Sequence, residues 1–205
     1  MNKSSLTQAR FAVGFVCLGL AGCGLLKPSG VTSRAFMLTP LASAPASPAQ
    51  TSAKAVGVGF VRLPGYLFPK SMAMRQGASE VVYLETAFWA ERLDSGLQRV
   101  IAANLATLLP TIQVRLSTWQ PEEVSAELYV AVEQFDVDVR GECSLQAWWR
   151  IVPPGGGEVW KAGQFQAVRT GPAPDADPDG AAASMSALAA DLSRDLAQTL
   201  ASIAP

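Results

Sequence analysis

The sequence predicts an α/β (α+β) sandwich, in which a mixed, largely antiparallel sheet packs against a long central helix and a C-terminal helix. Two observations predict the helices, and a third predicts the sheet. Apolar residues recur every three or four positions within 93–109 and again within 185–203, which is the period of an amphipathic helix. Between these segments, four stretches alternate apolar and polar residues, as half-buried strands do. A sheet flanked by two such helices favours a layered α+β domain.

Four further strands are predicted before the central helix, at 34–38, 56–63, 71–75 and 80–85. Gly77 lies between the last two, so these are expected to form a hairpin. Pro64 ends the second strand, because proline lacks the N–H that a sheet ladder needs. Residues 40–53 are almost entirely Ala, Ser, Pro, Thr and Gln. Such a composition cannot bury a core, and a flexible link is expected there.

The central helix is predicted to begin near Leu93 and to end before Pro110. Asp94 or Ser95 is the expected N-terminal cap, since both side chains accept hydrogen bonds from free backbone N–H groups. The helix should pack on the sheet through an apolar stripe that consists of Leu93, Leu97, Val100, Ile101, Leu105, Leu108 and Leu109.

The second half is predicted to contain a strand and then an antiparallel meander, at 112–119, 126–139, 142–152 and 158–168. In the first strand of the meander, the apolar parity changes between Val132 and Phe135, which predicts a bulge. The C-terminal helix should bury the face that carries Met185, Leu188, Leu192, Leu196, Leu200 and Ile203.

The first 22 residues have the organisation of a secretory signal. Lys3 and Arg10 precede an apolar run at 11–20. This run is too short to cross a bilayer core, which needs about 20 residues. A short apolar region behind a basic one is typical of a removable signal. Residues 20–23 (Leu-Ala-Gly-Cys) follow and resemble the lipobox of bacterial lipoproteins.

The lipobox resemblance implies cleavage before Cys23, a thioether-linked diacylglycerol on its sulfur and acylation of the new N-terminus. Residues 1–22 are then the signal peptide, 23–33 a lipid-anchored tether and 34–205 a single domain. Each buried methylene contributes about 0.8 kcal/mol, so several acyl chains anchor a protein firmly. Residues 24–26 lack the Asp that resembles an inner-membrane retention signal. The expected location is therefore the cell envelope, at the outer membrane and facing the periplasm.

The composition of the mature chain excludes several classes of function. Loss of Lys3 and Arg10 leaves 14 basic and 17 acidic residues, without the basic stripe that nucleic-acid binding requires. The sequence has no histidine, which excludes a Ser-His-Asp triad and a His-ligated zinc site. Cys143 is then the free thiol, and we expect it to be an inert, small apolar residue inside a strand. No enzyme activity, metal or cofactor is therefore predicted, apart from the covalent lipid on Cys23.

Two carboxylate pairs and a glycine run are the remaining candidates for chemistry. Glu122 and Glu123 follow a proline in a predicted loop, and Asp136 and Asp138 alternate with apolar residues on a predicted strand. Solvated faces of the protein explain both pairs better than a catalytic dyad does. Residues 155–157 are three glycines between two predicted strands, where a turn is expected instead of a phosphate-binding loop.

Several short motifs follow one another in a recognisable order. Residues 36–39 (Phe-Met-Leu-Thr) form a short strand behind the lipobox. Residues 56–59 (Val-Gly-Val-Gly) lead to 63–67 (Leu-Pro-Gly-Tyr-Leu). The central helix opens with 89–94 (Trp-Ala-Glu-Arg-Leu-Asp) and contains Asn104-Leu105, and a Trp148-Trp149 strand and an Ala-rich helix come last. In this order, over nearly the whole mature chain, they resemble the ABC-type transport auxiliary lipoproteins (the PqiC and YmbA type).

Two segments depart from the pattern of that family. Arg92 stands where the family usually has proline, and 68–70 (Phe-Pro-Lys) stand where Asp-Arg-Pro is common. The resemblance implies an α/β sandwich and a non-catalytic part in lipid traffic between two membranes. It also implies partners, namely an MCE-domain (mammalian-cell-entry) protein that forms a tunnel across the periplasm, and the permease and ATPase behind it. The lipoprotein is expected to dock that tunnel at the outer membrane, and homo-oligomerisation is left open.

The predicted partner-binding residues are Tyr66, Leu67, Phe68 and Trp89. The first three are consecutive apolar residues at a strand end, where they either contact the partner or cover the edge of the sheet. Trp89 is either a docking residue or, in the interpretation that we favour, a core anchor at the entry to the helix. The alternative function is that of a structural or assembly lipoprotein of the cell envelope with no transport role. A neighbouring gene for an MCE protein or an ABC permease would discriminate between the two.

Overall fold

The computed structural model describes residues 32–42, 55–116 and 118–203. The predicted signal peptide, the lipidation site Cys23 and most of the predicted link at 40–53 lie outside these residues. The described residues from Ser33 onward belong to one structural unit.

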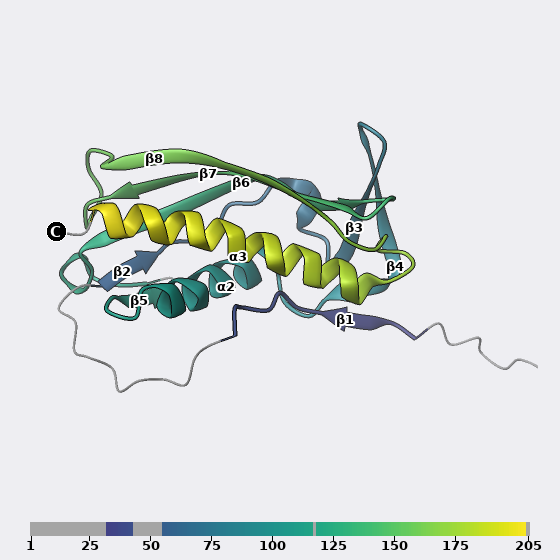
Figure 1. The fold of residues 1–205 in the computed structure, drawn as a ribbon, viewed down its shortest axis with the longest axis horizontal. Helices are drawn as coiled ribbons and strands as arrows, with labels where there is room; N and C mark the ends of the chain where they lie inside the picture. Colours follow the sequence, from purple (N-terminus) through teal and green to yellow (C-terminus); the bar gives the residue numbers. More distant parts are fainter. Residues whose placement is uncertain (1–31, 43–54, 117, 204–205) are drawn as a thin grey trace, which may run out of the picture. The chain divides into compact units, whose positions relative to one another are not determined.

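Eight strands of the described residues form one mixed sheet (Figure 1). They are β1 (Arg34–Phe36), β2 (Ala55–Val58), β3 (Ser71–Gln76), β4 (Glu80–Trp89), β5 (Gln113–Leu116), β6 (Ala126–Asp138), β7 (Glu142–Val152) and β8 (Lys161–Thr170). The other elements are the helices α2 (Leu93–Leu108) and α3 (Pro178–Ile203) and the short 3-10 turns η1 (Gly65–Leu67) and η2 (Pro121–Glu123). The predicted α+β fold, with a mixed sheet, a central helix and a C-terminal helix, is confirmed.

The long strand β6 organises the sheet. It pairs along one edge with β7, and β7 pairs with β8, so the three strands form the predicted antiparallel meander. The other edge of β6 is shared by β2 and β3, which both run parallel to it. Beyond these, β5 pairs with β2, β4 pairs with β3, and β1 pairs with β4. The longest ladders are antiparallel, so the sheet is largely antiparallel although it also contains parallel pairs.

A bulge lies in β6 where the sequence predicts it. The register with β7 shifts between Val132 and Gln134. As a result, Val132 and Phe135 both face the core, and Phe135 is completely buried. Without the shift, one of these two side chains would point to the opposite face of the sheet, because successive strand residues alternate between the faces.

Both helices cover the same face of the sheet (Figure 1). α3 lies along β6, β7 and β8, and α2 packs against α3 and against β2 and β5. Leu97 and Ile101 of α2, and Leu188 and Leu192 of α3, are completely buried. Burial of such a side chain contributes about 1.5–3 kcal/mol, so the two apolar stripes are a main source of stability, as predicted.

α2 begins at Leu93, as predicted, but its N-terminal cap differs from the prediction. The N-cap is Arg92, whose side chain makes no capping hydrogen bond. The expectation that Asp94 or Ser95 caps the helix is therefore wrong. Leu93, the first helical residue, is 4% exposed and part of the core. Asp94 lies in the first turn, where a carboxylate still interacts favourably with the N-terminal end of the helix dipole.

The predicted strand at 56–63 is regular only in its first part. β2 ends at Val58, and the chain then follows β6 through single hydrogen bonds that the N–H groups of Gly59 and Arg62 donate. A Cβ atom at Gly59 would lie 2.6 Å from the ring of Tyr129, so only glycine fits this close approach. The irregular segment leads directly into η1.

The opposite face of β6, β7 and β8, which we call the outer face, carries no helix among the described residues (Figure 1). On β7, buried Trp149 and Ile151 alternate with exposed Trp148 and Arg150, so the latter pair points to the outer face. This face therefore presents polar and aromatic side chains to the solvent.

Candidate partner-binding surface

Three of the four predicted partner-binding residues lie in or beside η1. The turn is closed by hydrogen bonds from the N–H of Leu67 to the carbonyl of Pro64 (3.1 Å) and from the N–H of Phe68 to the carbonyl of Gly65 (3.2 Å). It directs neighbouring side chains in different directions. Leu67 is 4% exposed and packs in the core, whereas the Phe68 ring is 57% exposed. Phe68 is therefore available to a partner, and Leu67 is not.

Tyr66 anchors the turn to the sheet. Its hydroxyl donates a 2.7 Å hydrogen bond to Oδ2 of Asp136, a β6 residue that is only 3% exposed. Burial, and next the bond to Asp136, raise the pKa of Tyr66 far above its ordinary value, so the hydroxyl keeps its proton. The Tyr83 hydroxyl in turn donates to the carbonyl of Tyr66 at 2.9 Å. These contacts give Tyr66 a structural role, whatever its part in binding.

Phe68 and Arg92 together form an exposed pair, which we call the Phe68–Arg92 patch. The Arg92 Cζ atom lies 5.7 Å from the centroid of the Phe68 ring, within the range of a cation–π contact. The Arg92 side chain is 66% exposed and is oriented by two hydrogen bonds to the Asp94 carboxylate, of 3.1 Å and 2.6 Å. The patch thus presents an aromatic ring and a fixed guanidinium side by side.

Trp89 lies at the end of β4 and is 5% exposed. Its backbone N–H donates to the carbonyl of Lys70 at 2.7 Å, and its indole belongs to the hydrophobic core. The structure therefore supports the core interpretation of this residue. The predicted residues are close in the fold, but only Phe68 among them offers a large exposed apolar surface.

Asp136 and Asp138 are not on a solvated face, so that expectation is wrong. Each is 3% exposed. The Nε of Arg75 donates to Asp136 at 3.0 Å, and the guanidinium of Arg140 donates to Asp138 at 3.0 Å. At this end of β6 the outer face is covered by η1 and by Arg75 from β3, which sequence alternation cannot reveal. Both carboxylates are therefore paired with an arginine, which compensates their charge inside the fold.

The remaining candidates for chemistry lie where the sequence predicts them. Glu122 and Glu123 are exposed, and the glycines at 155–157 form a turn in which all three have positive φ. Cys143 is buried in β7, and burial raises the pKa of its thiol to about 12, so the thiol is inert at neutral pH. Among the described residues, no cluster of three His, Cys, Asp or Glu side chains offers a metal site.

Sequence reasoning missed one polar residue of note. Glu127 in β6 is 6% exposed, although charged side chains are seldom buried. The only signal in the sequence is its position, since it alternates with Ala126 and Leu128, which face the core.

A sequence model of the ABC-type transport auxiliary lipoprotein component family matches residues 36–197. The chain belongs to this family. The match extends from β1 into α3, so it includes η1, the Phe68–Arg92 patch and the outer face of the auxiliary lipoprotein.

Solved structures show that the auxiliary lipoprotein has a known fold. A crystal structure of an uncharacterised protein is 19% identical, covers 82% of this chain and 99% of its own, and has a TM-score of 0.66. A protein from Xanthomonas campestris is 15% identical, with coverages of 80% and 92% and a TM-score of 0.63. At these identities the likeness concerns the fold alone. No curated protein matches the sequence. Within the described residues, no helix is both long enough and apolar enough to span a bilayer.

Proposed function

We propose that the auxiliary lipoprotein is a non-catalytic, membrane-anchored accessory of an ABC/MCE-type transport system. A lipid on Cys23 holds it at the outer membrane, where it docks the periplasmic tunnel of an MCE-domain protein for intermembrane lipid transport. Membership of a family of transporter auxiliary components supports the transport role. The lipobox at 20–23 supports the anchor, and the absence of histidine supports a non-catalytic role.

The Phe68–Arg92 patch is the observation that carries the docking proposal. Both side chains are exposed, and aromatic residues and arginine are among the types that dominate the free energy of interfaces. The two segments that depart from the family pattern, at 68–70 and at Arg92, meet at this patch although they are far apart in the sequence. A surface at which both departures from the family pattern meet fits the recognition of one particular partner.

Co-purification tests the proposal. A tagged, full-length copy is recovered from gently solubilised envelope, and the proteins bound to it are identified by mass spectrometry. Phe68→Ala and Arg92→Ala should each lower recovery of the MCE protein about tenfold, which corresponds to an interface contribution above about 1 kcal/mol. The melting temperature should stay near that of the wild type, because exposed substitutions change stability by less than about 0.5 kcal/mol.

Trp160→Ala is the matched control, since Trp160 is an exposed aromatic residue on the connection between β7 and β8. It should leave recovery unchanged. Equal recovery with all three variants would remove the patch from the interface. Wild-type protein that recovers no MCE protein, permease or ATPase would instead favour the structural or assembly lipoprotein.

The anchor is tested separately by Cys23→Ser. Because the thioether requires the cysteine sulfur, the variant should lose lipid attachment. Fractionation should then find it released as soluble protein or retained through an uncleaved signal peptide. Mass spectrometry that detects diacylglycerol on the variant would contradict the assignment of Cys23.

A further inference from the structure

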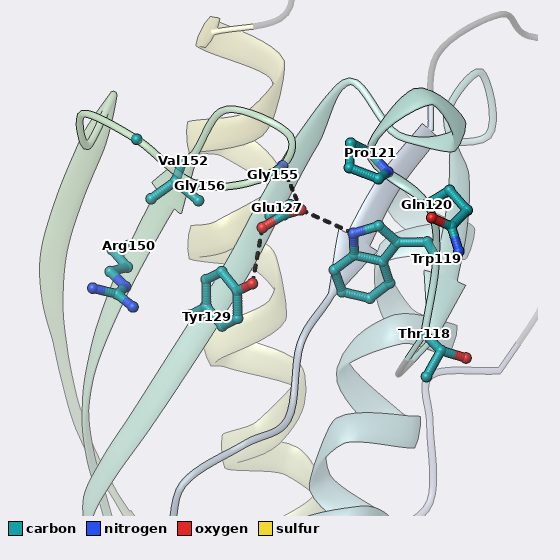
Figure 2. A pocket seen from close by; sticks show the side chains of 11 residues that line it. Thr118, Trp119, Gln120, Pro121, Glu127, Tyr129, Arg150, Val152, Gly155 and Gly156 are labelled. Carbon is teal, nitrogen blue, oxygen red and sulfur yellow. Dashed lines mark hydrogen bonds between the residues drawn. The ribbon is translucent and has the colours of Figure 1, made fainter.

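The outer face of the sheet is hollowed beside the first half of β6 (Figure 2). The cavity has a volume of about 770 Å³ and lies between η2, β6 and the glycine turn at 155–157. The rings of Trp119 and Tyr129 form two of its walls, and Glu127 and Arg150 also line it. None of these residues has a role in the Phe68–Arg92 patch.

Glu127 is a buried carboxylate that is held only by neutral donors. Its Oε1 accepts hydrogen bonds from Nε1 of Trp119 and from the N–H of Gly155, both at 3.0 Å. Its Oε2 accepts the hydroxyl of Tyr129 at 2.8 Å. Burial alone would raise the pKa of Glu127, but these hydrogen bonds outweigh it and lower the pKa, so the carboxylate is charged at neutral pH. Figure 2 shows the three donors converging on it.

The two other buried carboxylates on the same face of β6 each have a cation, and Glu127 does not. Asp136 pairs with Arg75, and Asp138 pairs with Arg140. No described lysine or arginine forms an ion pair with Glu127, although an uncompensated buried charge is costly. This uncompensated carboxylate lines a cavity that is large enough for a ligand, so a cationic group of a ligand could compensate its charge.

Arg150 supplies a positive charge at the other end of the same wall. The Tyr129 hydroxyl binds Glu127, while the Cζ atom of Arg150 lies 5.2 Å from the centroid of the Tyr129 ring. Arg150 is exposed and forms no ion pair with a described carboxylate. A buried anion and an unpaired cation therefore lie along one side chain, which suits a ligand that carries both charges.

An apolar groove of about 340 Å³ continues from the cavity. Tyr129 and Arg150 line both hollows, and the groove then extends between Phe60 and Trp148. These two rings are 66% and 49% exposed. Exposed apolar side chains gathered around a groove mark a site for a ligand or partner. Arg62 adds a second cation at the groove.

We propose that the outer face binds a zwitterionic phospholipid. Along this face, a carboxylate between two aromatic rings is followed by an arginine and then by an apolar groove. A phospholipid with an ethanolamine or choline headgroup has the matching order of ammonium, phosphate and acyl chains. The ammonium lies against Trp119 and Tyr129 near Glu127, as in aromatic cages for cations. The phosphate binds Arg150, and the chains follow the groove.

This inference goes beyond the docking role, because binding of a phospholipid by the outer face requires no MCE partner. It assigns to the lipoprotein itself a contact with lipid, in addition to the covalent anchor proposed on Cys23. The carboxylate, the arginine and the apolar groove follow one another in the order that a phospholipid requires. A free phosphate ester has no acyl chains to fill the groove.

Calorimetric titration tests the inference. The full-length, lipidated protein is kept in a surfactant with fluorinated chains, which compete poorly for a hydrocarbon groove. The probes are dihexanoylphosphatidylethanolamine, dihexanoylphosphatidylglycerol, phosphoethanolamine and inorganic phosphate. The first should bind most tightly. The glycerol lipid should bind more weakly because it lacks the ammonium, and phosphoethanolamine because it lacks the chains.

Two variants separate the headgroup from the chains. Arg150→Gln should weaken both dihexanoylphosphatidylethanolamine and phosphoethanolamine by at least about tenfold, since charge-assisted hydrogen bonds to the phosphate are lost. Phe60→Ala should weaken only the lipid, by roughly fivefold, through lost apolar contact. Arg115→Gln, an exposed arginine on β5, is the matched control and should change neither affinity. All three positions are exposed, so melting temperatures should stay near wild type.

Any of the following results would overturn the inference: no binding of the ethanolamine lipid by the wild type, equal binding of both dihexanoyl lipids, or affinities that are unchanged by Arg150→Gln and Phe60→Ala. Inorganic phosphate that binds as tightly as phosphoethanolamine would reduce the site to an anion site and also refute it. Co-purification of the MCE partner with the Arg150→Gln variant tests the two proposals separately, because this variant should lose lipid binding but still recover the partner. Lipid binding without partner recovery in the wild type overturns only the docking proposal, and partner recovery without lipid binding overturns only this one.

Discussion

Tyr66→Phe should destabilise the protein by about 2 kcal/mol. The change removes one oxygen and keeps the ring, so the main lost interaction is the 2.7 Å hydrogen bond to the buried carboxylate of Asp136. The long 3.5 Å hydrogen bond that the backbone N–H of Phe135 donates to the hydroxyl is also lost. Hydrogen bonds to charged groups contribute about 1.5–3 kcal/mol. The value should fall in the lower half of this range, because Asp136 keeps the hydrogen bonds from Arg75 and Gln134. For a domain of this size, a loss of about 2 kcal/mol lowers the melting temperature by roughly 4–8 °C.

Tyr83→Phe is the matched control for this measurement. It deletes the same atom, but the Tyr83 hydroxyl bonds the carbonyl of Tyr66 in an exposed position, so the loss should stay below about 1 kcal/mol. Urea unfolding followed by tryptophan fluorescence gives both values. A double-mutant cycle of Tyr66→Phe with Asp136→Asn should show a coupling energy of about 1 kcal/mol or more. Equal losses at the two tyrosines, with a coupling energy near zero, would refute the anchoring role of Tyr66.

Three further predictions concern the core and the pH dependence of stability. Burial alone would raise the pKa of Asp138, but the N–H groups of Glu142 and Arg140 and the Arg140 guanidinium lower it below the unfolded value. The stability that the Asp138 carboxylate adds is therefore present above its unfolded pKa of about 4, and it is lost as the pH falls through the folded pKa. Asp138→Asn should flatten this acid loss in urea titrations between pH 2 and pH 6, and an unchanged slope would contradict the assignment. Cys143 should resist maleimide at pH 8 until the protein is unfolded with urea; rapid labelling of the native protein would show that the thiol is accessible. Leu97→Asp should cost several kcal/mol, because it buries an unpaired charge, whereas Thr107→Ala on the same helix should cost about 0.5 kcal/mol or less. Similar melting temperatures for these two variants would contradict the orientation of the helix.

Local periodicity was sufficient to predict most of the fold. The helices at 93–109 and 185–203 and the meander of β6, β7 and β8 follow from spacings within a few residues. The bulge near Val132 was also predictable, because a change of apolar parity is visible in the strand itself. These features depend on neighbours in the sequence, which is the information that a single sequence contains.

Long-range polar contacts could not be predicted in this way. Asp136 is far from Tyr66 and Arg75 in the sequence, and only the fold brings the three together. Arg99 gives a second example. The helix pattern places it on the polar face of α2, but its guanidinium donates a 2.8 Å hydrogen bond to the carbonyl of Leu38. Exposure is likewise a property of the fold. It separates Leu67 from Phe68, which the sequence presents as equivalent neighbours.

The two proposed sites lie toward opposite ends of β6. Glu127 lies near the start of the strand, and Asp136, which holds η1 through Tyr66, lies near its end. Nine residues of extended strand correspond to about 30 Å. Substitutions that far apart act almost additively. A role of Phe68 in docking and a role of Arg150 in lipid binding are therefore separable in one protein. If the MCE tunnel docks at the Phe68–Arg92 patch, Arg150→Gln should leave docking intact and Phe68→Ala should leave lipid binding intact, so each proposal can fail without the other.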